Sequence, residues 1–308
     1  MKKRLAILLM MMLFFSFPAL AEKVSILCAA FPQYDTVMRV IAGHEEQFDV
    51  QLLMHSGVDL HNYQPSAMDI ARVASCQLMV VNGGESDTWL DHVLGAARNN
   101  NMKLIRFMDL AATHQEEALP GLTEAEEEDD AADEHVWLSL NNMKRFSDAV
   151  CGAVIALDAA NAADYKANCD QYIEALTALD AEYAQMVAAA KLNTVIVADR
   201  FPFLYLMRDY GLNYYAAFSG CSAESEASFE TMALLIRKTA ELRPGAVLVT
   251  ETSDRRLADT VAQSAGISQV LTLNAVQSVT DNDIQNGVTY LTLMKENLSV
   301  LRQALNPD

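Results

Sequence analysis

The sequence predicts an α/β protein made of two similar lobes, each a mainly parallel sheet flanked by helices, joined by one long helix. Short apolar runs alternate with helical stretches in both halves of the chain, a pattern typical of parallel sheets covered by helices. The chain of 308 residues is long enough to bury two cores. We therefore assign 22–157 to the first lobe, 158–191 to the connecting helix and 192–308 to the second lobe.

The connecting helix is predicted from an uninterrupted helical pattern. Between Gly152 and Pro202 there is neither glycine nor proline, and apolar residues recur there at helical spacing. A helix over about 163–191 would be on the order of 40 Å long, enough to run along both lobes. The apolar stripe consists of Tyr165, Cys169, Tyr172, Ile173, Leu176, Leu179, Tyr183, Met186 and Val187.

In the first lobe, four apolar runs predict strands and the stretches between them predict helices. The ligand crevice of a parallel sheet lies beyond the carboxyl ends of its strands. His61 follows the second predicted strand and Asp87 follows the third, so we expect both at this rim. The predicted strands are 23–29, 48–54, 78–81 and 104–107, and the predicted helices are 31–41, 66–74 and 89–97.

The second lobe repeats this alternation. Glu251 comes directly after the third of its predicted strands, so its side chain is also expected at the rim of the crevice. Gly211 is placed to end the first helix of the lobe. The predicted strands are 194–198, 214–218, 246–249 and 270–273, and the predicted helices are 202–210, 228–242, 256–265 and 288–305.

The first residues have the pattern of a secretory signal peptide. Basic residues at 2–4 precede an apolar run at 5–17 and a small-residue site that ends at Ala21. The run is short for a membrane span, although a retained anchor is the alternative. Leu27 precedes Cys28, whereas a lipoprotein cysteine usually follows a small residue. We expect cleavage after Ala21 and a periplasmic or secreted protein that is not a lipoprotein.

The chain is strongly acidic. Loss of the three basic residues at 2–4 would change the formal net charge from −19 to −22. Such a surface argues against nucleic acid and anionic membranes as partners. We call residues 114–134 the acidic loop, because 124–130 reads EAEEEDD. This loop either holds cations loosely near a cleft or is a disordered insertion.

The five cysteines form no Cys-x-x-Cys motif, which excludes a zinc ribbon or a dithiol redox motif. Cys151 and Cys169 fall at similar heights on two helices joined by a turn near Asn161. They could form a disulfide in an oxidising compartment, or they could be two buried thiols. The sequence leaves both alternatives open.

Two histidines have matching acidic and aromatic neighbours, in 59–65 (DLHNYQP) and 133–138 (DEHVWL). A neutral imidazole is the commonest protein ligand for a transition metal. More than seventy residues separate His61 from His135, which excludes a zinc finger or a helical His-x-x-x-His pair. If both bind one ion, the fold must bring two distant loops together. Asp59 and Asp133 could then orient the two imidazoles.

The chain resembles the substrate-binding proteins of zinc- and manganese-type metal ABC transporters, whose two lobes are joined by one rigid helix. The resemblance runs in order through nearly all of the chain after the leader. The matching stretches are 31–35 (FPQYD), 59–66 (DLHNYQPS), 82–89 (NGGESDTW), 133–139 (DEHVWLS), 224–228 (ESEAS) and 287–291 (GVTYL), with Met294, Asn297 and Leu298.

The resemblance implies a metal between the lobes, held by His61 and His135 from the first lobe and by two further ligands from the second. The second lobe of this chain contains no histidine. One expected ligand position falls on Arg200, which carries no lone pair for a metal. Asp199 and Glu251 are therefore our second-lobe candidates. Asn274 stands at the remaining position as a weak oxygen donor.

For each second-lobe candidate a purely structural role competes with metal binding. Asp199 could pair with Arg200, and Glu251 could cap the helix at 256–265. Arg200 could instead pair with Glu224 or Glu226 and help to close the cleft.

We expect a binding protein and not an enzyme, since no Gly-x-Ser-x-Gly, Walker or His-Glu-x-x-His motif occurs. It would capture a divalent metal, with Zn²⁺ favoured and Mn²⁺ the alternative, and pass it as a monomer to an ABC permease. One alternative is a secreted zinc-dependent hydrolase with Glu251 as its base. Another is a divergent binder with a changed ligand.

Overall fold

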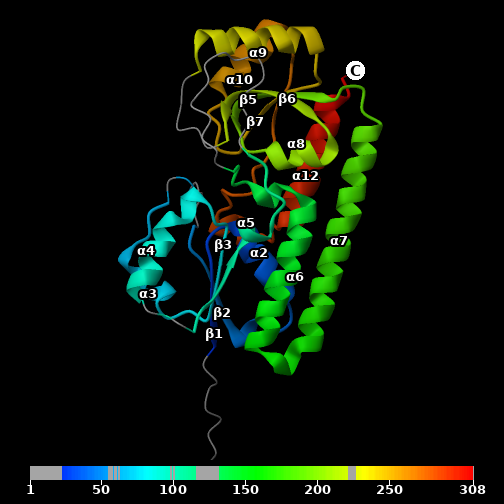
Figure 1. Cartoon of the computed structure of the whole chain (residues 1–308). Helices are drawn as coiled ribbons and strands as arrows, with labels where there is room; N and C mark the ends of the chain where they lie inside the picture. The colour runs from blue at the N-terminus through cyan, green and yellow to red at the C-terminus, as the bar shows by residue number, and fades with distance from the viewer. Residues whose placement is uncertain are drawn as a thin grey trace, which may run out of the picture.

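The computed structural model describes residues 23–54, 58, 61, 63–97, 99, 101–115, 132–220 and 227–307. The predicted leader, most of the acidic loop, Asp59, Cys221, Glu224 and Glu226 lie outside the described residues. Two α/β lobes lie one above the other in Figure 1, and the long helix α7 runs beside both. The predicted fold class is therefore confirmed.

Each lobe contains a four-stranded, fully parallel sheet, and the two sheets have the same strand order. The order is β2-β1-β3-β4 in the first lobe and β6-β5-β7-β8 in the second. The strands are β1 (Val24–Cys28), β2 (Phe48–Leu52), β3 (Leu78–Val81), β4 (Lys103–Arg106), β5 (Thr194–Phe201), β6 (Asn213–Ser219), β7 (Val247–Val249) and β8 (Val270–Thr272).

Helices cover these sheets, and most of them begin within two residues of the predicted positions. The short helices α5 and α11 were not predicted. The helices are α2 (Phe31–Val40), α3 (Ala67–Val73), α4 (Thr88–Ala97), α5 (Phe107–Leu110), α6 (Leu140–Leu157), α7 (Ala162–Ala188), α8 (Leu204–Tyr210), α9 (Phe229–Leu242), α10 (Arg256–Ala265), α11 (Asp281–Gln285) and α12 (Tyr290–Leu305).

The connecting helix α7 contacts elements of both lobes. It packs against α6 and α2 on the first-lobe side and against α8 and α12 on the other (Figure 1). The Tyr183 hydroxyl donates a hydrogen bond of 2.6 Å to the carbonyl of Met294 in α12. Its buried face is the predicted stripe without the partly exposed Ile173 and Val187: Tyr165, Cys169, Tyr172, Leu176, Leu179, Tyr183 and Met186.

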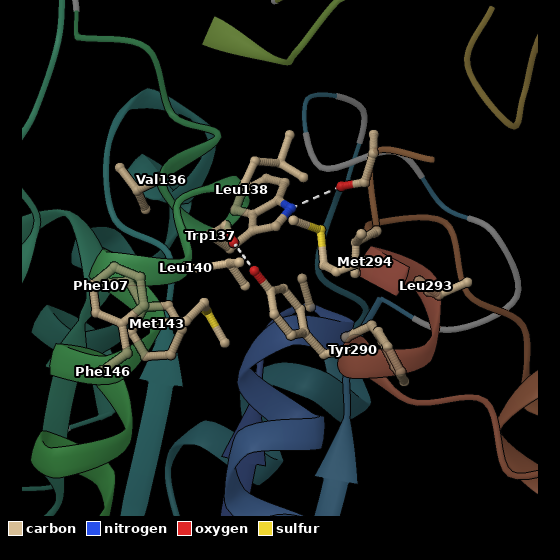
Figure 2. Packing of buried hydrophobic residues seen from close by; sticks show 14 of the residues in the cluster. Phe107, Val136, Trp137, Leu138, Leu140, Met143, Phe146, Tyr290, Leu293 and Met294 are labelled. Atoms are coloured by element: carbon tan, nitrogen blue, oxygen red, sulfur yellow. Dashed lines mark hydrogen bonds between the residues drawn. The ribbon is translucent and has the colours of Figure 1, made fainter. Parts of the chain in front are cut away.

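The segment that follows His135 forms part of a core shared by the two lobes. Trp137 is fully buried, and its indole Nε1 donates a 2.8 Å hydrogen bond to the carbonyl of Ala275 (Figure 2). The Tyr290 hydroxyl donates to the Trp137 carbonyl over 2.6 Å. Ser139, the N-cap of α6, also donates from Oγ to Asp209 over 2.7 Å. The residues around His135 are thus fixed between the lobes.

Cys151 and Cys169 are two buried free thiols on adjacent helices, α6 and α7. Their Sγ atoms donate to the carbonyls of Tyr165 and Ser147, and burial raises the pKa of Cys169 to about 12. The structure therefore contains two free thiols at these positions and no disulfide between them.

None of the helices in the described part of the chain has, by itself, the length and apolar composition of a membrane span. Taken together, α6 and α7 have that length and composition, but the chain bends sharply between them.

Candidate metal site

The imidazoles of His61 and His135 lie close together. Their ring centres are 5.5 Å apart and the ring planes meet at 60°. Two imidazoles that bind one ion at N–metal distances of about 2 Å and a near-tetrahedral angle have ring centres roughly 5 Å apart. The fold therefore brings these two histidines to a separation that suits a shared ion.

His135 is held by its neighbour Asp133 and is fully buried. Asp133 Oδ1 accepts the backbone N–H of His135 over 2.8 Å and lies 3.1 Å from the ring nitrogen Nδ1. A carboxylate beside Nδ1 favours the proton on that nitrogen and leaves the lone pair on Nε2. Asp133 thus orients the imidazole, as the sequence suggested.

His61 is positioned by a turn that follows β3. Its Nδ1 lies 2.9 Å from the hydroxyl of Ser86 and 4.0 Å from Oε2 of Glu134. Glu134 is only 4% exposed, and its Oε1 accepts the backbone N–H of Ser86 over 3.0 Å. Two consecutive acids, Asp133 and Glu134, therefore contact different histidines.

Asp87 stabilises the same turn. Its Oδ2 accepts the backbone N–H of Gly83 over 2.8 Å. Burial raises the pKa of Asp87 to about 6, and the nearby Glu134 carboxylate adds to this rise. Gly84 allows the turn to approach Glu134, because a Cβ at Gly84 would overlap with Glu134 Oε1. The turn is shaped around the Glu134 side chain.

In the second lobe, Asp199 lies within β5 and uses both carboxylate oxygens in local hydrogen bonds. Oδ1 accepts the backbone N–H of Arg200 over 2.8 Å. Oδ2 accepts the backbone N–H of Thr250 over 3.0 Å and its hydroxyl over 2.8 Å. Asp199 therefore ties β5 to the turn after β7.

Glu251 holds the loop that follows β8. Its Oε2 accepts the backbone N–H of Ala275 over 2.8 Å, and Oε1 is buried without a hydrogen-bond partner in the described part of the chain. Burial raises the pKa of this carboxyl. Asn274 directs its Oδ1 to the backbone N–H of Val276, 2.7 Å away, within its own loop.

The structure does not gather all four predicted ligands. Among the described residues, no group of three or more His, Cys, Asp or Glu side chains is arranged to hold a metal ion. The second lobe approaches His135 through a backbone segment instead: a Cβ added to Gly220 would lie 3.1 Å from His135 Cε1. His61 and His135 are brought together, while Asp199 and Glu251 brace loops of their own lobe.

The second lobe also holds the base of the acidic loop. Gln115 and Ala132 form an antiparallel bridge, and Asp133 donates its backbone N–H to the carbonyl of His114 over 2.9 Å. The hydroxyl of Tyr205, in α8, accepts the His114 N–H over 3.1 Å and donates to the Asp133 carbonyl over 2.8 Å. One second-lobe side chain thus contacts both ends of this loop.

Sequence reasoning missed three features of the site: Glu134, Ser86 and Gly220. Glu134 and Ser86 lie within the stretches 133–139 and 82–89 that carry the family resemblance, so their position in these stretches was a usable signal. The approach of Gly220 to His135 depends on how the lobes pack, and no local pattern encodes that.

Comparison with known proteins gives a consistent result. The family model described as "Zinc-uptake complex component A periplasmic" (ZnuA) matches residues 26–304. The "Zinc-binding lipoprotein AdcA" of Streptococcus pneumoniae is 29% identical over 294 residues, which are 93% of this chain. They are 56% of AdcA, so the chain spans about half of that protein. The "High-affinity zinc uptake system protein ZnuA" of Bacillus subtilis is 25% identical, covering 92% of this chain and 88% of that protein.

Solved structures show the same similarity. The Zn(II)-bound ZnuA-like domain of Streptococcus pneumoniae AdcA matches with a TM-score of 0.73 at 26% identity, covering 92% of this chain and all of that domain. The metal-dependent lipoprotein YcdH of Bacillus subtilis shares the fold, with a TM-score of 0.77 at 24% identity and coverage of 92% and 99%.

Proposed function

We propose that this chain, which belongs to the zinc-uptake complex component A (ZnuA) family, captures a zinc ion with high affinity and delivers it to an ABC permease. The observation that carries the proposal is the 5.5 Å separation of the His61 and His135 ring centres. Nitrogen ligands of this kind favour zinc over manganese, which prefers more oxygen. The family is one of uptake components, so the hydrolase alternative is not supported.

In this proposal, His61 and His135 bind zinc through Nε2 and the second lobe adds an oxygen. Glu251 is the better second-lobe candidate, because its Oε1 is buried and has no hydrogen-bond partner of ordinary geometry among the described residues. The loop that Glu251 holds contacts Trp137, whose ring centre lies 5.2 Å from that of His135. Asp199 would have to release Thr250 to bind a metal, so we assign it a bracing role.

We also propose that the protein acts outside the cytoplasm as a monomer, with its signal peptide removed after Ala21 and no lipid on Cys28. Cys28 is the last residue of β1 and is fully buried, and β1 pairs with both β2 and β3. Cleavage before Cys28 would remove the rest of a central strand. Because a relative is a lipoprotein, the mass of the exported protein is the direct check.

Zinc binding is tested on the chain after its metal has been removed with a chelator. We expect titration against a chromogenic zinc competitor to give one ion per chain with a Kd below about 1 µM. The double variant His61→Ala, His135→Ala should bind more than about 100-fold more weakly. Tight zinc binding by the double variant would overturn the site, and absence of binding by the native chain would overturn the function.

A further inference from the structure

We propose that Glu134, acting through Ser86, is the positioning residue for His61, as Asp133 is for His135. Neighbouring acids in the chain would then each prepare one imidazole for the ion. The inference rests on the proposed zinc site. It concerns how the imidazoles are held, and it can therefore be tested in the metal-free protein.

Glu134 is fixed at several points beside the site. Its backbone carbonyl accepts a hydrogen bond of 2.7 Å from the side-chain amide of Asn82, and its Oε1 accepts the Ser86 backbone N–H. The second contact fixes the residue whose hydroxyl lies 2.9 Å from His61 Nδ1. Loss of the Glu134 carboxylate would therefore loosen the hydroxyl that orients the ring.

The charge of Glu134 also selects the form of the imidazole. Its Oε2 is buried and lies 4.0 Å from His61 Nδ1. A buried carboxylate at this distance favours an N–H at Nδ1 over a lone pair, because the two negative ends would repel. Nδ1–H then donates to Ser86 Oγ, and the lone pair remains on Nε2 for the metal.

The surroundings strengthen this effect. The part of Glu134 that faces His61 is shielded from water, and the described residues place no lysine or arginine in an ion pair with Glu134. When zinc binds, positive charge spreads onto His61, and a nearby buried carboxylate stabilises that charge.

The test combines zinc affinity with the tautomer of each histidine, read from ¹⁵N NMR shifts of the metal-free protein. Glu134→Gln keeps an oxygen for the Ser86 N–H and removes the charge. We expect His61 to lose its preference for the Nδ1–H form, His135 to stay unchanged, and zinc affinity to fall about 10- to 100-fold. The matched control Asp133→Asn should change His135 and leave His61 as it is.

Ser86→Ala provides a second variant in case Glu134→Gln folds poorly, and it should change the His61 tautomer alone. Unchanged tautomers in both variants would overturn the positioning role. If Glu134→Gln lost zinc while both tautomers stayed the same, Glu134 would be a direct ligand and the inference would be wrong. If the native chain bound no zinc, the proposed function would fail, while the tautomer measurement would still decide this inference.

Discussion

The two halves of the candidate site use their carboxylates in opposite ways. In the first lobe, Asp133 and Glu134 direct oxygens towards imidazoles. In the second lobe, Asp199 and Glu251 direct oxygens towards backbone N–H groups of their own loops. Both lobes have the same strand order, so the difference does not arise from the architecture. An acidic residue at the rim of a sheet is available to a metal only if its oxygens are not already used by the loops around it.

The largest effect should come from the first lobe. His135→Ala removes an oriented imidazole from a buried position, and zinc affinity should fall by more than about 100-fold. His44→Ala is the matched control, because His44 pairs with Asp164 on the surface and should leave affinity unchanged. Competition titration measures the zinc affinity of both variants. Equal zinc affinities for His135→Ala and His44→Ala would contradict a zinc site at His135.

Asp199→Asn should affect stability and leave binding nearly unaltered. In one orientation the new amide NH2 would face the N–H and hydroxyl of Thr250, which are also donors, and in the other it would face the backbone N–H of Arg200. Either mismatch should lower the free energy of unfolding by about 1–3 kcal/mol. Chemical denaturation measures this loss, and zinc titration should stay within about threefold of the native chain. A tenfold loss of affinity at unchanged stability would make Asp199 a ligand after all.

Glu251→Gln should weaken zinc binding and leave the stability of the fold nearly unaltered, the reverse of Asp199→Asn. Burial raises the pKa of Glu251, so the charged form weakens the fold as pH rises through that pKa, and the neutral amide removes this penalty. Gln also keeps an acceptor for the Ala275 N–H. We expect unfolding stability at pH 7 to be maintained while zinc affinity falls about tenfold. Unchanged affinity would leave the second lobe without a ligand among our candidates.

The smallest effect should come from the contact between the lobes. Tyr290→Phe removes the hydroxyl that donates to the Trp137 carbonyl and should lower the free energy of unfolding by about 1 kcal/mol. The ring stays in place, so zinc affinity should change little. A large loss of affinity, measured in the same titration, would mean that the position of residues 133–139 depends on this single bond.

Much of the fold was predictable because the pattern is local. The run at Leu78–Val81 matches β3 residue for residue, and Gly211 ends α8 in the left-handed conformation as expected. Strand β5 runs three residues beyond its predicted end, because Arg200 and Phe201 pair with β6 past a register shift. That pairing is made across the sheet and leaves no trace in the periodicity of the run itself.

The arrangement of the candidate site was predictable only in part, for a similar reason. The repeated acid–histidine pattern predicted His61 and His135, which the structure brings together, and Asp133, which contacts His135 from two residues away in the sequence. The use of Asp199 depends on Thr250, which is 51 residues away, and that of Glu251 on Ala275. Such hydrogen bonds become visible only when the loops are in place.

The hydroxyl of Tyr205 links three parts of the molecule mechanically. It joins helix α8 to the backbone of His114 and of Asp133, on the two sides of the acidic loop. A rotation of the second lobe would therefore displace, in one movement, both ends of the acidic loop and Asp133, the residue that orients His135. If the proposed release of zinc requires the lobes to move apart, the contacts that orient His135 would change in the same movement.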